Sequence, residues 1–286
     1  MLFSERYGYK KVTQVLQVEE LNYETKVGLW NVLTKFYWDK ADKDKYWDSS
    51  PEMSDLISSL WCDYFKLPID EIEDLFWDNV HKIIKNFYFS EEAHWYEVYD
   101  FIEFIGNCKA FSLYLRSFKK ECNKVLERER TAYRFIGNHI TSIVNDNEIK
   151  EVETALNNNK LKHVSTHLDN ALELLSDRKN PDYRNSIKES ISAVEGVARL
   201  ISGNKKAELR PALKELEEKL GVEVHGALRE GFIKIYGYTS DGDGIRHALT
   251  DSSTVNFEDA KFMLVTCSAF VNYLVSKAQQ AEIDLS

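Results

Sequence analysis

Proline and glycine are scarce in this chain, with four prolines and twelve glycines among 286 residues. Proline interrupts helices and glycine weakens them, so their scarcity leaves room for long helices. No stretch approaches the roughly 18 apolar residues of a membrane-spanning helix, and we expect none. The N-terminal residues MLFSERY also lack the basic and then apolar order of a secretory signal peptide. With 43% hydrophobic residues, the chain can bury a substantial core.

The four cysteines, Cys62, Cys108, Cys122 and Cys267, are scattered along the sequence. They form no CxxC pair and show no spacing typical of metal ligands. This usage is typical of reduced thiols in a cytoplasmic protein and excludes a disulfide framework. The sequence also contains no P-loop, dinucleotide fingerprint, GxSxG or HExxH motif. We therefore expect a cytoplasmic protein that uses no metal and no cofactor.

The chain carries more acidic than basic side chains, so its net charge is -10 and its pI is near 5.3. This balance argues against a general nucleic-acid coat protein. The deficit is uneven: residues 150–286 carry 18 basic against 21 acidic side chains, whereas residues 1–149 carry 19 against 26. Any basic pocket in the nearly neutral C-terminal part is therefore expected to be small and specific.

The tryptophans divide the sequence, since all six lie within the first 95 residues. The C-terminal half is rich in Leu, Ile, Val and Ala instead. This shift predicts two domains with a boundary between about residues 130 and 150. We expect a helical N-terminal domain over residues 1–130, a β-hairpin connector over residues 131–149 and a helical bundle over residues 150–286.

The N-terminal part contains amphipathic helical patterns with a high aromatic content. Apolar residues recur every three or four positions in residues 27–38. They do so again in a helix predicted after Pro68, at Ile72, Leu75, Phe76, Val80, Ile83, Ile84 and Phe87. Such aromatic stripes suit either a core or a base-stacking surface. The helical spacing favours the core.

A short stretch departs from the helical pattern. Residues 131–136 and 139–144 are rich in β-formers and flank Gly137-Asn138. Glycine at the first position of a two-residue loop is typical of a type II′ hairpin. In that register Ile136 faces His139, and Arg134 and His139 lie diagonally on one face. Their R-x4-H spacing is best interpreted as a consequence of the hairpin.

The C-terminal half shows clear helices. Pro181-Asp182 marks the start of one helix and Gly203 its end. Its core-facing stripe consists of Ile187, Ile191, Val194, Ala198 and Ile201. The final helix is predicted to begin with Asn256 as its cap and to be apolar nearly all round. We expect it at the centre of a bundle.

The least helix-like, most glycine-rich stretch of this half is residues 236–249 (YGYTSDGDGIRHAL). Asp243 can cap a short helix whose first turn contains Arg246 and His247. Free backbone N–H groups, a guanidinium and an imidazole would then converge, as a phosphate site requires. The alternative is a capped turn in which Arg246 pairs with a nearby carboxylate. His163 and His167, spaced i, i+4, lack a third metal ligand and are better interpreted as surface histidines.

Several segments of the sequence resemble the AbiJ-type abortive-infection proteins of bacteria. The N-terminal similarity lies in residues 3–9 (FSERYGY) and 29–33 (LWNVL). The C-terminal similarity lies in residues 174–195, in residues 236–248 and in the final helix. Together they span nearly the whole chain. The resemblance implies an AbiJ-type N-terminal domain followed by a HEPN-like four-helix bundle, which often forms dimers.

The HEPN resemblance implies roles for particular residues. Defence HEPN domains are commonly metal-independent RNases whose motif is an Arg, often followed by a polar residue, with a His four to six residues later. Arg246 and His247 match its start, but Thr250, Asp251 and Ser252 occupy the positions of the later His. Either His247 serves as the general base, or the domain binds RNA or a partner without cleavage. Glu195, Asp243 and Asp251 are supporting candidates.

The sequence and the resemblance together lead to one hypothesis and one alternative. We expect an all-α protein with one small hairpin that acts on RNA in anti-phage defence, as a metal-independent endoribonuclease. Arg246 would hold the scissile phosphate and His247 would remove the 2′-hydroxyl proton. The alternative is a non-catalytic dimeric regulator or sensor that binds RNA or protein. Because HEPN sites are usually shared across a two-fold axis, we expect a homodimer through the C-terminal domain.

Overall fold

A computed structural model gives the fold of the chain. It describes residues 7, 17–41, 45–48, 50–158, 161–177, 180–203, 211, 225–241 and 255–285, the side chains of 238–241 excepted. In these ranges the named elements are helices and one two-stranded hairpin, which confirms the predicted all-α class. All four cysteines are free thiols. Among the helices in these ranges, none combines the length and apolar character that crossing a membrane requires.

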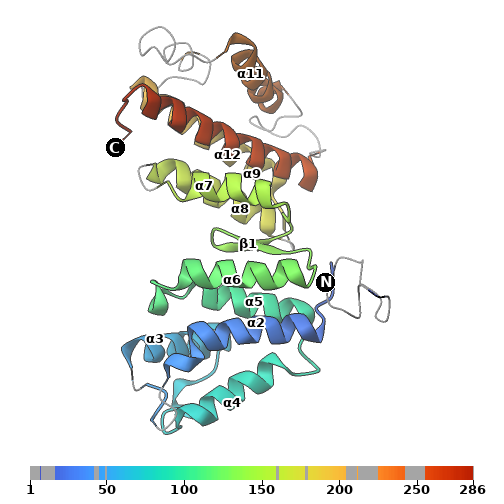
Figure 1. The fold of residues 1–286 in the computed structure, drawn as a ribbon, viewed down its shortest axis with the longest axis vertical. Helices are drawn as coiled ribbons and strands as arrows, with labels where there is room; N and C mark the ends of the chain where they lie inside the picture. Colours follow the sequence, from blue (N-terminus) through green and yellow to red (C-terminus); the bar gives the residue numbers. More distant parts are fainter. Residues whose placement is uncertain are drawn as a thin grey trace. The chain divides into compact units, whose positions relative to one another are not determined.

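The chain divides into two compact units, Met1–Ser142 and Ile143–Ser286. The first unit contains α2 (Tyr23–Phe36), α3 (Pro51–Ser59), α4 (Trp77–Tyr88), α5 (Trp95–Asn107) and α6 (Leu115–Arg128) (Figure 1). A π-helical turn (Leu60–Tyr64) continues α3, and short 3-10 turns occupy Trp38–Lys40, Ile69–Glu71 and Lys109–Phe111. Helix α2 packs on α6, and α5 also contacts α6.

The first unit has an aromatic core. Five of the six tryptophans are buried and Trp95 is partly buried, so the core interpretation of the aromatic stripes is confirmed. Trp30 packs against Trp38 and Tyr88 with ring centroids 5.9 and 5.0 Å apart. Buried aromatic side chains contribute large contact areas and fix the helices that carry them.

The predicted helix after Pro68 is interrupted. A 3-10 turn follows the proline, and α4 begins only at the second residue beyond Leu75. At the break, the carbonyl of Ile72 accepts a 3.0 Å hydrogen bond from the N–H of Leu75 in a local turn and a 2.7 Å bond from the indole N–H of Trp47. Phe76 and Ile83, predicted on the buried stripe, are exposed. The apolar periodicity of the sequence thus continues across a turn that a distant tryptophan stabilises.

The hairpin forms at the predicted turn and in the predicted register, with strands shorter than the runs 131–136 and 139–144. Strands β1 (Arg134–Ile136) and β2 (His139–Thr141) pair antiparallel, with Ile136 opposite His139. Gly137 has φ of +56°, the left-handed conformation that a type II′ turn requires at this position. Strand β1 packs on α6 and β2 on α5, so the hairpin is part of the first unit.

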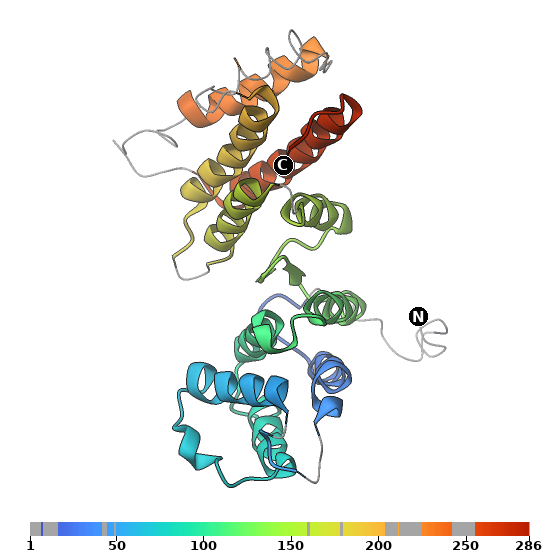
Figure 2. The ribbon, with the colours of Figure 1, turned by 90° about the vertical axis from the view of Figure 1, so that its left-hand side faces the viewer.

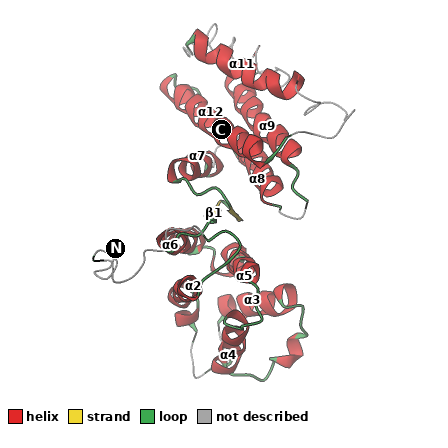
Figure 3. Ribbon diagram, turned by 90° about the vertical axis from the view of Figure 1, so that its right-hand side faces the viewer, coloured by secondary structure: helices red, strands yellow, loops and turns green. Residues whose placement is uncertain are grey.

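The second unit is a helical bundle of α7 (Asp146–Leu156), α8 (Lys162–Ser176), α9 (Tyr183–Ser202) and α12 (Phe257–Gln280) (Figure 2). Helix α12 contacts the other three, which confirms its predicted central place. Helix α11 (Gly226–Asp241) lies against α9. Figure 3 shows that helices dominate both units.

The ends and the buried face of the bundle helices follow the sequence signals. Asp182 caps α9 by accepting from the N–H of Asn185, and Gly203 ends it at φ of +67°. The predicted stripe of α9 is buried throughout. Asn256 caps α12 and forms a capping box with Asp259, as predicted.

Candidate functional site

The predicted phosphate site falls largely outside the described residues. Asp243, Arg246, His247 and Asp251 belong to a segment that the structure does not describe. One part of the prediction is wrong: residues 236–241, expected in a loop, form the last turns of α11. A glycine near the end of a helix weakens it by only about 1 kcal/mol, which neighbouring residues can offset.

Glu195 is the supporting candidate that the structure describes. This α9 side chain is buried, with the residue 6% exposed. Its Oε2 accepts a 3.0 Å bond from Arg199 Nη2, one helical turn away. Its Oε1 accepts a 2.8 Å bond from the hydroxyl of Tyr236 on α11. The carboxylate therefore ties α11 to α9 on the flank of the bundle, since a buried charge needs such partners.

Of the pair Arg134 and His139, the arginine has a structural role. Arg134 is buried, and its Nη1 donates to the carbonyls of Thr131 and Tyr133 at 2.9 and 2.8 Å. These bonds hold the chain that enters the hairpin. The R-x4-H spacing thus reflects the strand register, as the sequence analysis inferred.

The two histidines of α8 form no metal site with their described neighbours. His167 Nδ1 lies 2.7 Å from Glu189 Oε2 on α9, and His163 is exposed. No group of three His, Cys, Asp or Glu side chains that would suit a metal occurs in the described part of the chain. The His167–Glu189 pair joins α8 to α9 at the bundle surface.

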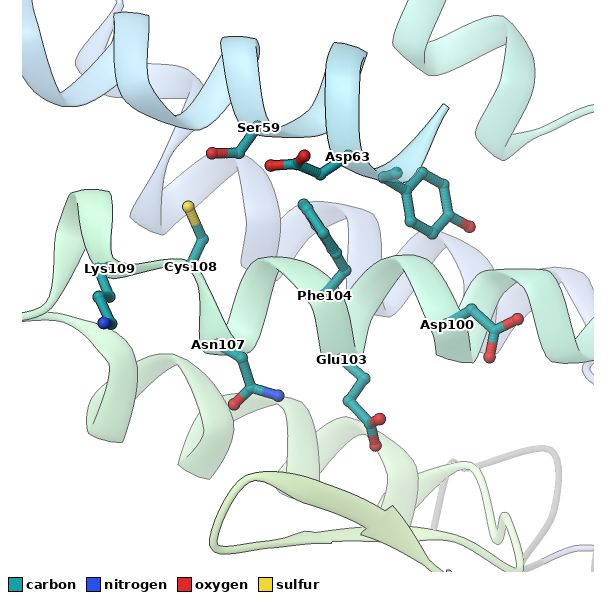
Figure 4. A pocket seen from close by; sticks show the side chains of 9 residues that line it. Ser59, Asp63, Asp100, Glu103, Phe104, Asn107, Cys108 and Lys109 are labelled. Atoms are coloured by element: carbon teal, nitrogen blue, oxygen red, sulfur yellow. The ribbon is translucent and has the colours of Figure 1, made fainter. Parts of the chain in front are cut away.

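A pocket in the first unit was missed by the sequence analysis (Figure 4). It has a volume of about 690 Å³ and lies between α5 and the α3 region. Its lining residues are Ser59, Asp63, Tyr64, Asp100, Glu103, Phe104, Asn107, Cys108 and Lys109. The spacing of Asp100, Glu103 and Asn107 along one face of α5 is the sequence signal that marks it.

The acidic side chains of this pocket do not converge. In Figure 4, Asp63 lies beside Ser59, whereas Glu103 points toward the hairpin. Glu103 accepts a hydrogen bond from the backbone N–H of Ile140, and burial raises the pKa of this carboxyl above its ordinary value. Asn107 Nδ2 donates to the carbonyl of Asn138 at 2.7 Å. This rim of the pocket therefore holds the hairpin in place.

A comparison with models of protein families shows to which family the chain belongs. The model described as AbiJ N-terminal domain 4 matches residues 1–158. The chain belongs to the AbiJ family. No curated protein and no solved structure matches it.

The AbiJ match confirms the N-terminal part of the resemblance. It extends beyond the first compact unit and includes α7, a helix that packs on α12 in the second unit. The HEPN-like character of the C-terminal half stays a prediction. The aromatic unit and the first helix of the bundle therefore belong to one family region.

Proposed function

We propose that this AbiJ-family chain is a bacterial anti-phage protein that acts on RNA through a HEPN-like C-terminal half, as a metal-independent endoribonuclease. The AbiJ match over residues 1–158 supports the anti-phage part of this proposal. The RNA-cleaving part rests on the resemblance of Arg246 and His247 to the start of the HEPN motif. AbiJ-type proteins are abortive-infection proteins, which stop phage spread at the expense of the infected cell.

The architecture of the second unit supports the same proposal. Helices α7, α8, α9 and α12 pack together, which agrees with the four-helix arrangement implied by the HEPN resemblance. Residues 174–195, which carry part of that resemblance, include the last turn of α8 and most of α9. A rigid bundle is a suitable support for a small site on an adjoining segment.

The proposed chemistry needs an anion-binding group and a base. Arg246 binds the scissile phosphate through its guanidinium. His247 removes the proton of the adjacent 2′-hydroxyl, whose oxygen attacks phosphorus while the bond to the 5′-oxygen breaks. The departing 5′-oxygen takes up a proton. The products are a 2′,3′-cyclic phosphate and a 5′-hydroxyl, and no divalent metal takes part.

This proposal is tested by incubating purified full-length protein with total RNA in EDTA. Cleavage with cyclic-phosphate ends is expected for the wild type and absent for Arg246→Ala. Arg116→Ala is the matched control, because Arg116 is an exposed arginine on α6 in the first unit. An intact RNA sample after wild-type treatment, or equal cleavage by wild type and Arg246→Ala, would contradict the nuclease assignment.

A second candidate function is a non-catalytic dimeric regulator that binds RNA or protein. It is favoured by Thr250, Asp251 and Ser252 at the positions of the later motif histidine. An apolar strip on α12 supports the dimer: Phe262 is 58% exposed, and Val265 is partly exposed. Light scattering at micromolar concentration should then show a dimer that Phe262→Glu weakens. A monomer for the wild type would contradict it.

A further inference from the structure

A second pocket of the first unit lies between the start of α2 and the end of α4. It has a volume of about 410 Å³. Helix α2 contributes Tyr23, Val27, Trp30 and Asn31. Helix α4 contributes Lys85 and Asn86, and the residue that follows it contributes the ring of Phe89. These residues include three aromatic rings, two carboxamides and one ammonium group. The acid-lined pocket near the hairpin has a different composition.

Three aromatic side chains meet at this pocket, and Tyr23 is the most exposed of them. The Phe89 ring centroid lies 5.9 Å from that of Tyr23 and 5.5 Å from that of Trp30. Trp30 is buried and packs on Tyr88, so its position is fixed by the core. Tyr23, in contrast, is 68% exposed. A flat aromatic ligand can therefore stack on the exposed ring of Tyr23, which packs on Phe89 beside the buried Trp30.

The polar side chains at this pocket make no hydrogen bond or ion pair to the described residues. They are those of Asn31, Lys85 and Asn86, and all three residues are exposed. A carboxamide offers both donors and acceptors, which is the combination that pairs with the edge of a nucleobase. An ammonium group binds phosphate. Stacking, edge recognition and phosphate binding are thus all available at one place.

We propose that this pocket binds a nucleotide, with the base stacked on Tyr23 and the phosphate at Lys85. The base could belong to a free nucleotide or to single-stranded RNA, because both present the same chemistry. Residues 1–149 carry 26 acidic against 19 basic side chains. That excess repels a long polyanion, so a free nucleotide is the favoured source. The proposal is independent of RNA cleavage by the C-terminal half.

The test is calorimetric titration of the full-length protein with AMP, with adenosine and with a ten-residue oligoadenylate. AMP should bind with a Kd of about 1 mM or tighter, and adenosine more weakly. Tyr23→Ala should weaken AMP binding about fivefold to a hundredfold, the contribution of stacking one base. Lys85→Ala should weaken AMP binding and leave adenosine binding unchanged.

Two control variants separate the pocket from general effects. Lys82→Ala removes an exposed ammonium group one turn earlier on α4, and Tyr96→Ala removes an exposed tyrosine of α5. Both should bind AMP like the wild type, and all variants should melt like it. Tighter binding of the oligonucleotide than of AMP would identify RNA as the source. Absence of AMP and oligonucleotide binding, or binding unchanged in Tyr23→Ala, would overturn the proposal.

Discussion

Val194 occupies the middle of the buried stripe of α9 and is 2% exposed. Replacing it with aspartate removes apolar contacts worth about 1.5–3 kcal/mol. It also buries a polar group, which costs about 2–7 kcal/mol without a partner and drives the carboxyl to take up a proton. The sum is at least about 3.5 kcal/mol. Because domains are stable by only about 5–15 kcal/mol, Val194→Asp should unfold the second unit or bring it close to unfolding.

Two spectroscopic signals distinguish this outcome from a general loss of folding. All six tryptophans lie in the first unit, so their fluorescence reports on that unit, whereas far-ultraviolet circular dichroism reports on all helices. In urea titrations followed by circular dichroism, Val194→Asp should lose the helical signal of the second unit at a much lower urea concentration than the wild type. The tryptophan fluorescence of the first unit should still change in one cooperative transition. Leu200→Asp is the matched control: it lies on the same helix, is 44% exposed and should cost less than about 1 kcal/mol. Equal midpoints for wild type and Val194→Asp, or equal losses in both variants, would refute the helix register.

Three further substitutions test contacts in the two units. Gly28→Ala places a Cβ atom 2.6 Å from Val125 Cγ1, so calorimetry should show a loss of about 1–3 kcal/mol despite the better helix propensity of alanine. Glu103→Gln should stabilise the fold at pH 7 and lose this advantage below about pH 4.5. Burial raises the pKa of this carboxyl from 4.5, so its ionisation lowers the stability of the wild type as pH rises. A stability difference between variant and wild type that stays the same across this pH range would contradict the reasoning. Tyr236→Phe removes a donor to buried Glu195 and should cost about 1.5–3 kcal/mol by chemical denaturation, whereas an unchanged midpoint would show that this bond contributes nothing.

Local signals in the sequence predicted the parts of the fold that local chemistry determines. The cap at Asn256, the left-handed Gly203 and the turn at Gly137 each depend on residues within one turn of the chain. The stripe of α9 was predictable because its period matches the helix over 15 residues.

Long-range contacts explain the predictions that were wrong or missing. The turn before α4 is bonded by Trp47, 25 positions from its acceptor at Ile72. The pocket beside Tyr23 joins residues of α2 to Phe89, and no sequence motif links them. Most of the predicted aromatic stripe lies in the core, whereas Phe76 within it and Tyr23 before it are exposed. Tyr23 is the ring on which the proposed nucleotide would stack.

We propose that this AbiJ-family chain defends bacteria against phage through Arg246. The most direct measurement is plaque formation on cells that produce equal amounts of wild type or Arg246→Ala, with the melting of both purified proteins measured in parallel. We predict fewer plaques with wild type, full plaque numbers with Arg246→Ala and the same melting temperature for both. If Arg246 instead neutralises a buried carboxylate such as Glu195, the variant should lose about 3–5 kcal/mol of stability. Equal plaque numbers with and without the wild-type protein, or a variant that fails only because it unfolds, would contradict the claim.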